Sequence, residues 1–421
     1  MKRKRPSHKI RFVYLLSVLL CILTFSGCTT DSNRPEFHPS PRPQGGPTAF
    51  KHQQDNIAVS TATSGATPET SSPTPSQSPA PTITATPTQT LPPATFYNFD
   101  EGVNPLTGLR VKNPALLERR PVMVKVSNWP RIGRPHAGLS SADIVFEYYI
   151  GYQMNRFLAI YYGKNASLIG PVRSGRLVDA QLTDLYQGLL AYGDADPGVE
   201  EALVNTLGER ALTFRFLPCP AMCGQTTHSA TGVFANSDEL SRYADQMGIN
   251  NQQPDLRGMY FQPEPPKGDE HGSFISFEYA DFSVMQWHYD ASSGLYDLWQ
   301  DAEADDGSII LYPTVDRNNN QRVSFANIVI LYANYIEYTP SLHDIEIKTS
   351  SSYQPALLFR DGEMIYGTWR AAYANRPLNF ETLDGESMPF KPGNTWIIIA
   401  GNHTITEQVK VGHWEFSFDL P

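Results

Sequence analysis

Apolar residues are distributed very unevenly along this chain of 421 residues. A continuous apolar run occupies residues 12–25, few apolar residues occur in residues 29–98, and residues 99–421 mix apolar and polar positions throughout. The first run is about 14 residues long, whereas a helix that spans a bilayer needs about 20. The pattern therefore predicts a short N-terminal leader, a polar segment and a folded body.

The leader has the features of an export signal. Six Lys or Arg residues precede the apolar run, which ends at Phe25-Ser26-Gly27-Cys28, a string similar to the lipobox of bacterial lipoproteins. We therefore expect residues 1–27 to be removed as a signal peptide, and Cys28 to carry palmitate-type acyl chains. These chains would anchor the protein to the cell membrane on its extracytoplasmic face. An uncleaved membrane anchor and a plain cleaved secretory signal are the alternatives.

Residues 28–98 are rich in Pro, Thr, Ser and Ala. Such a composition buries too little apolar surface to offset the entropy lost on ordering, so this segment is predicted to be a disordered tether. With about 3.1 Å per residue of extended polyproline conformation, its reach is on the order of 200 Å. The folded body is therefore expected to stand away from its anchor within the cell envelope.

Residues 99–255 are predicted to form a layered α/β domain. Residues 121–126 alternate like a strand, and residues 143–149 and 156–162 predict a hairpin around Gly151. Strands that are mixed with helices along the sequence favour a fold in which a sheet packs against a layer of helices.

The helices of this domain are expected in its second half. Apolar residues at helical spacing predict one helix between Ser174 as the N-cap and Gly188 as the stop. Residues 189–192 form an apolar run typical of a buried strand, and Asp196-Pro197 predicts the start of a second helix that ends near Leu207.

Residues 256–421 are predicted to form a second, mostly antiparallel β domain, a sandwich or partly closed barrel. Strand-like alternation is found throughout this segment, and Asp361-Gly362 between two apolar runs is a strong signal for a two-residue hairpin. The predicted fold class of the whole body is therefore α+β.

Charge narrows the classes of partner. Without residues 1–27 the chain has 27 Lys and Arg against 43 Asp and Glu, a formal charge of −16. A surface of this sign repels polyanions, which disfavours binding to nucleic acid and docking on anionic lipid headgroups. The expected partners are the membrane, through the lipid, and an envelope protein or cell-wall ligand.

Two cysteines remain once Cys21 has left with the leader and Cys28 carries lipid. In an oxidising exterior, Cys219 and Cys223 are expected to form a local disulfide. Free thiols are one alternative. Metal ligation with His228 is another, but zinc prefers four ligands and no fourth is evident, so no metal is expected. No motif for a cofactor is present, and none is expected.

Several strings resemble the YerB-like family of bacterial lipoproteins. The N-terminal half carries Asn104-Pro105-Leu106-Thr107-Gly108, Arg134-Pro135-His136-Ala137-Gly138-Leu139, Ala142-Asp143-Ile144-Val145 and Ile169-Gly170-Pro171-Val172-Arg173-Ser174. The C-terminal half carries Asn327-Ile328-Val329, Thr368-Trp369 and Lys391-Pro392-Gly393-Asn394-Thr395-Trp396. The resemblance covers most of residues 100–400 and implies an anchored two-domain envelope protein, without an established activity.

The preferred candidate site lies where the strand at residues 189–192 meets the helix after Asp196. Layered α/β folds place ligands at such junctions. Asp194 and Asp196 would face this region, and Arg173 and Arg176 would reach it from the preceding helix. Arginine forks suit carboxylate or phosphate groups. The alternative is structural: Asp196 caps its helix, and the arginines pair with Asp179 or Asp184.

Three further patterns are weaker. Asp143 and Glu147 share one strand face, but their α-carbons would be roughly 13 Å apart, so pairing with Arg156 or Arg173 is favoured over acid–base chemistry. Residues 316–327 imitate a calcium loop without its Gly and Glu, and a solvated turn is preferred. His228 beside Ser229 or Cys223 is expected to be structural rather than catalytic.

The leading hypothesis is therefore a surface-anchored binding or scaffolding protein with Arg173, Arg176, Asp194 and Asp196 as the ligand-binding residues. The competing hypothesis is a hydrolase of cell-wall glycan or peptide, in which Asp143, Asp194 or Asp196 acts as acid or base.

Overall fold

The computed structural model describes residues 97–224, 231–348 and 352–420. The leader, Cys28, nearly all of the tether, His228 and Ser229 lie outside these residues. Among its described residues, the first part of the body contains three α-helices and seven strands: β1 (Val122–Ser127), β2 (Ile144–Gly151), β3 (Met154–Tyr161), α2 (Leu177–Leu185), β4 (Leu189–Tyr192), α3 (Pro197–Leu207), β5 (Ala211–Thr213), β6 (Met222–Cys223), β7 (Phe234–Ala235) and α4 (Ser237–Gln246). Short 3-10 helices occur at η1 (Pro114–Glu118), η2 (Arg131–Gly133), η3 (Leu139–Ser141) and η4 (Gly208–Arg210).

The local signals placed most of these elements correctly. The predicted hairpin is β2–β3, and Asp196 caps α3 by accepting a hydrogen bond from the Gly198 amide at 3.0 Å. The N-cap of α2, however, is Arg176 rather than Ser174. Asp179 Oδ2 accepts a hydrogen bond from the Arg176 backbone N–H at 2.7 Å, and this contact fixes the start of the helix.

The second part of the body consists of strands. They are β8 (Tyr260–Phe261), β9 (Glu270–Ala280), β10 (Ser283–Asp290), β11 (Leu295–Glu303), β12 (Ile309–Pro313), β13 (Ser324–Phe325), β14 (Asn327–Ala333), β15 (Tyr335–Thr339), β16 (Leu342–Ile345), β17 (Gln354–Arg360), β18 (Glu363–Arg370), β19 (Asn379–Thr382), β20 (Pro389–Phe390), β21 (Thr395–Gly401), β22 (Ile405–Lys410) and β23 (Gly412–Ser417). The predicted Asp361-Gly362 hairpin joins β17 to β18, and both turn residues have positive φ.

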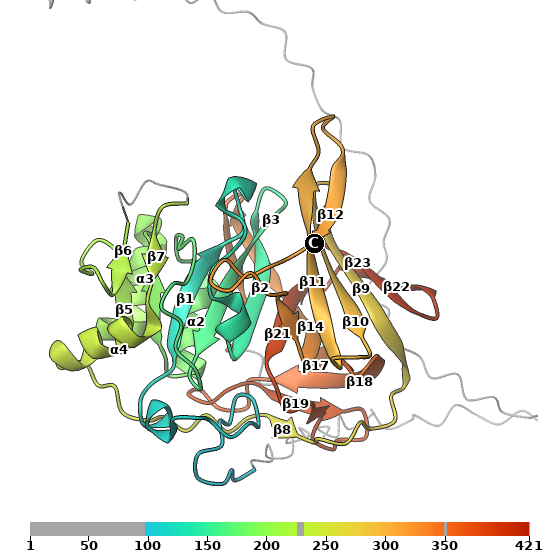
Figure 1. Ribbon diagram of the computed structural model, residues 1–421, viewed down its shortest axis with the longest axis horizontal. Helices are drawn as coiled ribbons and strands as arrows, with labels where there is room; N and C mark the ends of the chain where they lie inside the picture. The colour runs from blue at the N-terminus through green and yellow to red at the C-terminus, as the bar shows by residue number, and fades with distance from the viewer. Residues whose placement is uncertain (1–96, 225–230, 349–351, 421) are drawn as a thin grey trace, which may run out of the picture. The chain divides into compact units, whose positions relative to one another are not determined.

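A single large mixed sheet joins the two parts of the body (Figure 1). Successive pairings give the strand order β5-β4-β1-β3-β2-β21-β14-β17-β18-β19. The junction is β2, which runs parallel to β21 with Val145 opposite Trp396. The boundary predicted at residue 255 stays a prediction, but the strands on its two sides share this sheet.

A second leaf of strands folds over one face of the large sheet. Its strands β9, β10, β11, β22 and β23 pair with one another, β12 and β13 both pair with β11, and β9 reaches the first leaf through β18. No closed barrel forms in the described residues, and the two leaves pack as a sandwich, which is one of the two predicted arrangements. Parallel pairs also occur here, between β14 and β21 and between β23 and β9.

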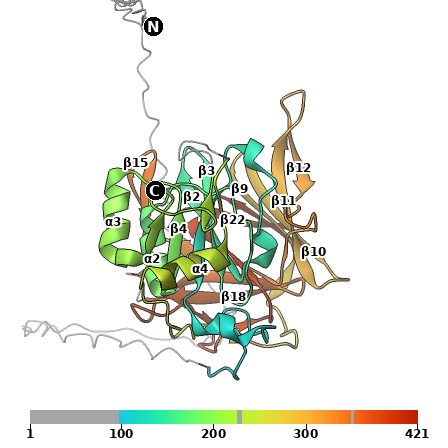
Figure 2. The same cartoon turned by 60° about the vertical axis from the view of Figure 1, so that its left-hand side comes forward.

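Two apolar cores stabilise these layers. Between the leaves, the fully buried Trp396 ring packs against Phe157 and Trp287, with ring centroids 4.9 and 5.9 Å apart. On the opposite face of the large sheet, α2 and α3 lie side by side and cover β1–β4 (Figure 2). Each large apolar side chain buried in this way contributes about 1.5–3 kcal/mol. None of the helices in the described ranges has the length and apolar character needed to cross a bilayer.

Candidate anion-binding site

Four basic side chains gather where β1 ends and α2 begins. Lys125 lies on β1, Arg156 on β3, and Arg173 and Arg176 on the segment that leads into α2. In the strand register Arg156 lies opposite Ser127 of β1 and Tyr148 of β2. Directly opposite residues point to the same face, so Lys125 and Arg156 both face the layer of α2 and α3. These four residues are called the cationic cluster below.

Lys125 is neutralised within the protein. Its ammonium is fully buried, lies 3.2 Å from Asp179 Oδ1 and donates to the Tyr148 hydroxyl, which in turn donates to Asp179. Burial lowers the pKa of Lys125 to about 7, although the Asp179 carboxylate opposes this shift. Asp179 also accepts from the Arg176 backbone amide, so its oxygens are already used.

Arg156 is buried without a carboxylate partner. Its Nη1 donates to the Ser174 carbonyl at 2.9 Å, and it forms no ion pair with a described residue. Burial lowers its pKa well below the ordinary value, and the positive charges of Arg176 and Arg173 lower it further. The three guanidinium groups therefore lie within electrostatic reach of one another, and they repel.

Arg173 and Arg176 are partly exposed and incompletely bonded. Arg176 Nη1 donates to the Gly175 carbonyl at 2.9 Å, but the Nε groups of both arginines are buried and lack a partner among the described residues. Burial lowers the pKa of each. The structural alternative of ion pairs with Asp179 or Asp184 is not observed, because Asp184 pairs with Arg210 and Lys348.

Asp194 and Asp196 border the cluster without pairing to it. Asp194 Oδ1 accepts from the Ala195 amide at 2.9 Å and lies 3.7 Å from Arg215. The backbone carbonyl of Asp194 accepts from the Gly175 amide at 2.8 Å, which places this turn beside the cluster. Asp196 caps α3, and its negative charge reaches the guanidinium of Arg176. The junction therefore brings the four predicted residues into one region, with the carboxylates at its border.

Asp143 belongs to a different part of the molecule. It is buried, and its carboxylate accepts from the amides of Tyr162 at 2.6 Å and Gly163 at 2.9 Å and from Asn104 Nδ2 at 3.0 Å. Burial raises its pKa to about 6. Asp143 directly precedes β2. The first residue of β2, Ile144, lies at the same level of the sheet as Met123 of β1 and Leu190 of β4. Asp194 follows the last residue of β4, so the two aspartates lie at opposite ends of their strands.

This position does not suit acid–base catalysis. Three strand spacings of about 4.8 Å separate β2 from β4, so Asp143 and Asp194 lie beyond the roughly 5–9 Å that glycosidase carboxylates require. Glu147 is fully buried between the two leaves. The favoured pairing of these acids with Arg156 or Arg173 is absent as well, because Arg156 turns to Ser174.

The calcium-like loop is an exposed turn over residues 317–321, as predicted, but its first residue is a buried carboxylate. Asp316 is fully buried and accepts hydrogen bonds from the amides of Gly138 and Ser140 at 3.0 and 2.9 Å. These contacts engage one carboxylate oxygen with Gly138 of the Arg134–Leu139 string and the other with Ser140, which directly follows the string. No cluster of three or more metal-ligating side chains occurs in the part of the chain that the structure describes.

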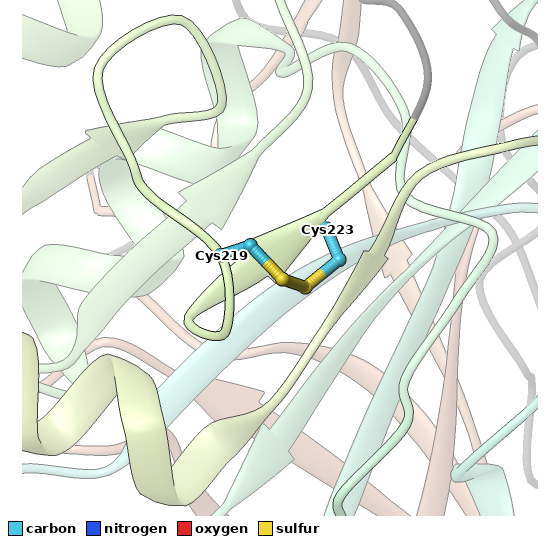
Figure 3. Close-up of a disulfide and its surroundings, with 2 residues drawn as sticks. All are labelled: Cys219 and Cys223. Carbon is cyan, nitrogen blue, oxygen red and sulfur yellow. A yellow bond between two sulfur atoms is a disulfide. The ribbon is translucent and has the colours of Figure 1, made fainter.

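Cys219 and Cys223 are joined by a disulfide at the start of β6 (Figure 3). A sulfur atom in a disulfide offers no thiolate, so neither the free-thiol alternative nor metal ligation applies to this state. The bond closes a short loop from Cys219 to Cys223, the second residue of β6.

Sequence reasoning missed Lys125, Arg156 and Asp179 as members of the site. Lys125 stands alone among apolar residues in a strand in which all six residues are buried. A single lysine in such a strand was a usable signal, because a fully buried lysine requires a partner.

Comparison with known proteins shows which family this chain belongs to. Two protein-family models match it, "Protein of unknown function (DUF3048) N-terminal domain" over residues 106–250 and the corresponding C-terminal domain over residues 275–397. Together they cover more than half of the sequence. The chain belongs to the DUF3048 family. The first match contains the whole cationic cluster.

YerB of Bacillus subtilis is similar to this chain in both sequence and structure. "Putative lipoprotein YerB" of strain 168 is 29% identical over 299 residues, which span 70% of this chain and 85% of that protein. The crystal structure of YerB protein has a TM-score of 0.58 with 26% identity, and it covers 70% of this chain and 96% of that chain. The resemblance to YerB-like proteins predicted from the sequence is confirmed.

Proposed function

We propose that this DUF3048 protein is a lipid-anchored, extracytoplasmic binding protein whose cationic cluster recognises a carboxylate or phosphate group of an envelope ligand. The observation that carries the proposal is the imbalance of charge at the cluster. Four basic side chains share one directly paired carboxylate, Asp179, among the described residues.

An anion would relieve this imbalance. Two unit charges 4 Å apart attract by about 4 kcal/mol near a protein surface, and hydrogen bonds to charged groups contribute about 1.5–3 kcal/mol each. The unpartnered Nε groups of Arg173 and Arg176 supply donors for such bonds. The site also lies at the carboxyl ends of the parallel strands β1 and β4, where layered α/β folds bind ligands.

Two observations support the lipid anchor, one from the sequence and one from a similar protein. Cys28 follows a leader of the expected length and charge, and the similar Bacillus subtilis protein has the word lipoprotein in its name. The acidic mature chain would be kept at the membrane by acyl chains rather than by attraction to anionic headgroups.

The test is anion-dependent stability of the full chain extracted from membranes. A ligand that binds the folded state raises its unfolding free energy by about 2.7 kcal/mol at a concentration one hundred times Kd. At constant ionic strength, phosphate or citrate should raise the unfolding temperature more than chloride does. The rise should disappear in Arg173→Gln/Arg176→Gln and persist in Arg110→Gln, a matched control in which the altered arginine is exposed and distant in sequence. An equal rise in all three proteins would refute the proposed site.

A further inference from the structure

We infer that the ligand of the cationic cluster is a phosphomonoester carried on a polyhydroxy compound. This inference rests on the proposed function of the same site and makes it specific. It follows from three properties of the cluster: its excess of charge, its number of donor groups and the free carboxylate oxygens at its border.

The charge favours phosphate over carboxylate. Asp179 pairs directly with Lys125, and although the charges of Asp179 and Asp196 also reach Arg176, none of the three arginines forms an ion pair with a carboxylate of the described residues. A carboxylate brings one negative charge, whereas a phosphomonoester brings about −1.5 to −2 at neutral pH. Of the two anions, only the phosphomonoester carries enough negative charge to balance most of the positive charge of the three arginines.

The donor groups lead to the same class of anion. Three guanidinium groups lie within electrostatic reach of one another, one on β3 and two on the segment before α2, and the Nε groups of Arg173 and Arg176 have no partner among the described residues. A carboxylate has two oxygens in one plane, which a single arginine fork already satisfies. A phosphomonoester has three terminal oxygens in a tetrahedral arrangement, so it can accept from several forks at once.

The two carboxylates at the border of the site indicate the chemistry of the part of the ligand beyond its anionic group. Asp194 and Asp196 each use Oδ1 to accept a backbone amide, and their Oδ2 atoms form no hydrogen bond with a described residue. Carboxylate oxygens accept hydrogen bonds from hydroxyl groups, and they repel a second anion. The part of the ligand that extends past Arg176 is therefore expected to be hydroxylated and uncharged, as in a sugar or polyol phosphate.

Calorimetry with matched ligands tests this inference on the full chain extracted from membranes. Glycerol 3-phosphate and glycerate share hydroxyl groups but differ in the anion, and inorganic phosphate lacks the hydroxyl groups. We expect glycerol 3-phosphate to bind at least about 10-fold more tightly than glycerate and more tightly than inorganic phosphate, since one charged hydrogen bond is enough for a tenfold change. A bisphosphate should bind no more tightly than its monophosphate.

Two sets of variants separate the parts of the site. Arg173→Gln/Arg176→Gln should lose glycerol 3-phosphate and inorganic phosphate alike. Asp194→Asn/Asp196→Asn should keep inorganic phosphate and lose the preference for glycerol 3-phosphate. Asn also serves as an N-cap, so α3 is preserved in this variant.

The source of the phosphomonoester is resolved by a second pair of probes. Phosphatidylcholine vesicles with and without phosphatidic acid present the group on a lipid, and glycerol 3-phosphate presents it free. Arginine-dependent binding of glycerol 3-phosphate that exceeds binding of the phosphatidic acid vesicles supports the inference. The glycerol hydroxyls of phosphatidic acid are acylated, so arginine-dependent binding of these vesicles that equals or exceeds binding of glycerol 3-phosphate would overturn the polyhydroxy part of the inference.

Two negative results remain distinguishable. Arginine-dependent binding of glycerate that equals or exceeds binding of glycerol 3-phosphate would overturn the phosphomonoester and leave the proposed anion site intact. If none of the anions binds, both the phosphomonoester inference and the proposed anion-binding function are overturned.

Discussion

Glu147 Oε2 accepts a hydrogen bond from Trp396 Nε1 at 2.7 Å, and this bond connects β2 to β21 at the junction of the two parts of the body. The other oxygen of Glu147 accepts from Asn155 Nδ2 at 2.5 Å. The carboxylate is fully buried and forms no ion pair with a described residue. Burial raises its pKa to about 7, while the hydrogen bonds from Trp396 and Asn155 oppose the shift.

Glu147 should therefore make the stability of the protein depend on pH. A carboxyl group whose folded pKa exceeds its unfolded value contributes stability that is fully present below about pH 4.5 and is lost as pH rises through about 7. The Glu147→Gln variant removes this titration. Relative to the natural chain, it should gain about 1–3 kcal/mol of unfolding free energy between pH 5 and pH 8, since each pKa unit corresponds to about 1.36 kcal/mol.

Urea denaturation of both proteins across this pH range measures the difference. Comparing variant with natural chain at each pH cancels the contributions of Lys125 and Asp143, whose pKa values are also shifted. A difference in unfolding free energy that stays constant from pH 5 to pH 8 would show that Glu147 does not titrate in this window.

Asp316 should be a major stabilising residue of the body. Its carboxylate accepts from the Gly138 and Ser140 amides and from the Ser140 hydroxyl at 2.7 Å. Each buried donor left without a partner costs about 1–3 kcal/mol, so Asp316→Ala should lower the unfolding free energy by about 2–4 kcal/mol. Asp306→Ala, which removes an exposed turn carboxylate bonded only to Ser308, should cost less than about 1 kcal/mol.

The same denaturation experiment also tests the calcium interpretation of this loop. Because both Asp316 oxygens are occupied by protein donors, added Ca²⁺ should leave the unfolding midpoint of the natural chain unchanged. A Ca²⁺-dependent rise that Asp316→Ala abolishes would contradict this account.

Short-range signals in the sequence were sufficient for much of the fold. The Asp361-Gly362 turn and the Asp196-Pro197 helix start depend on the backbone preferences of two adjacent residues, and both were found in the expected places. The parallel pairing of Val145 with Trp396 was not predictable, because the two strands are about 250 residues apart and carry no local mark of their partnership. That pairing decides that the body contains one continuous sheet.

The candidate site was predictable only in part, for a related reason. Arg173, Arg176, Asp194 and Asp196 were found because they flank a recognisable strand–helix junction. Arg156 joins them through the register of β3 against β1, which depends on the packing of the whole sheet. Asp316 was misjudged because a polar loop resembles a solvated turn until a distant backbone supplies its donors.

The arginines of the cationic cluster should contribute to anion binding without stabilising the folded protein. Burial lowers the pKa of Arg156, and the positive charges of Arg176 and Arg173 lower it further, so replacing those two charges relieves an unfavourable interaction. Without anions, Arg173→Gln/Arg176→Gln should unfold at the same temperature as the natural chain or higher. The matched variant Arg210→Gln breaks a 2.9 Å ion pair with Asp184 and should lower the unfolding free energy by about 1 kcal/mol.

Calorimetric unfolding in chloride buffer compares these proteins directly. Functional residues often lower stability, whereas structural arginines raise it, so the sign of the change separates the two roles. A clear loss of stability in Arg173→Gln/Arg176→Gln, equal to that of Arg210→Gln, would mean that the cluster is a structural element rather than a ligand site.

Cys28 should determine where the protein is found. Two acyl chains hold a protein durably in a bilayer, and the mature chain, with its formal charge of −16, has little electrostatic attraction for anionic headgroups. In Cys28→Ser, acylation is impossible, and we expect the protein to leave the membrane pellet. Cys21→Ser changes a cysteine inside the leader and is the matched control, which should remain in the pellet. Metabolic labelling with palmitate, followed by fractionation, measures both properties. Full retention of unlabelled Cys28→Ser in the membrane pellet would show that the uncleaved leader is the anchor, and palmitate label on Cys28→Ser would show that another residue carries the acyl chain.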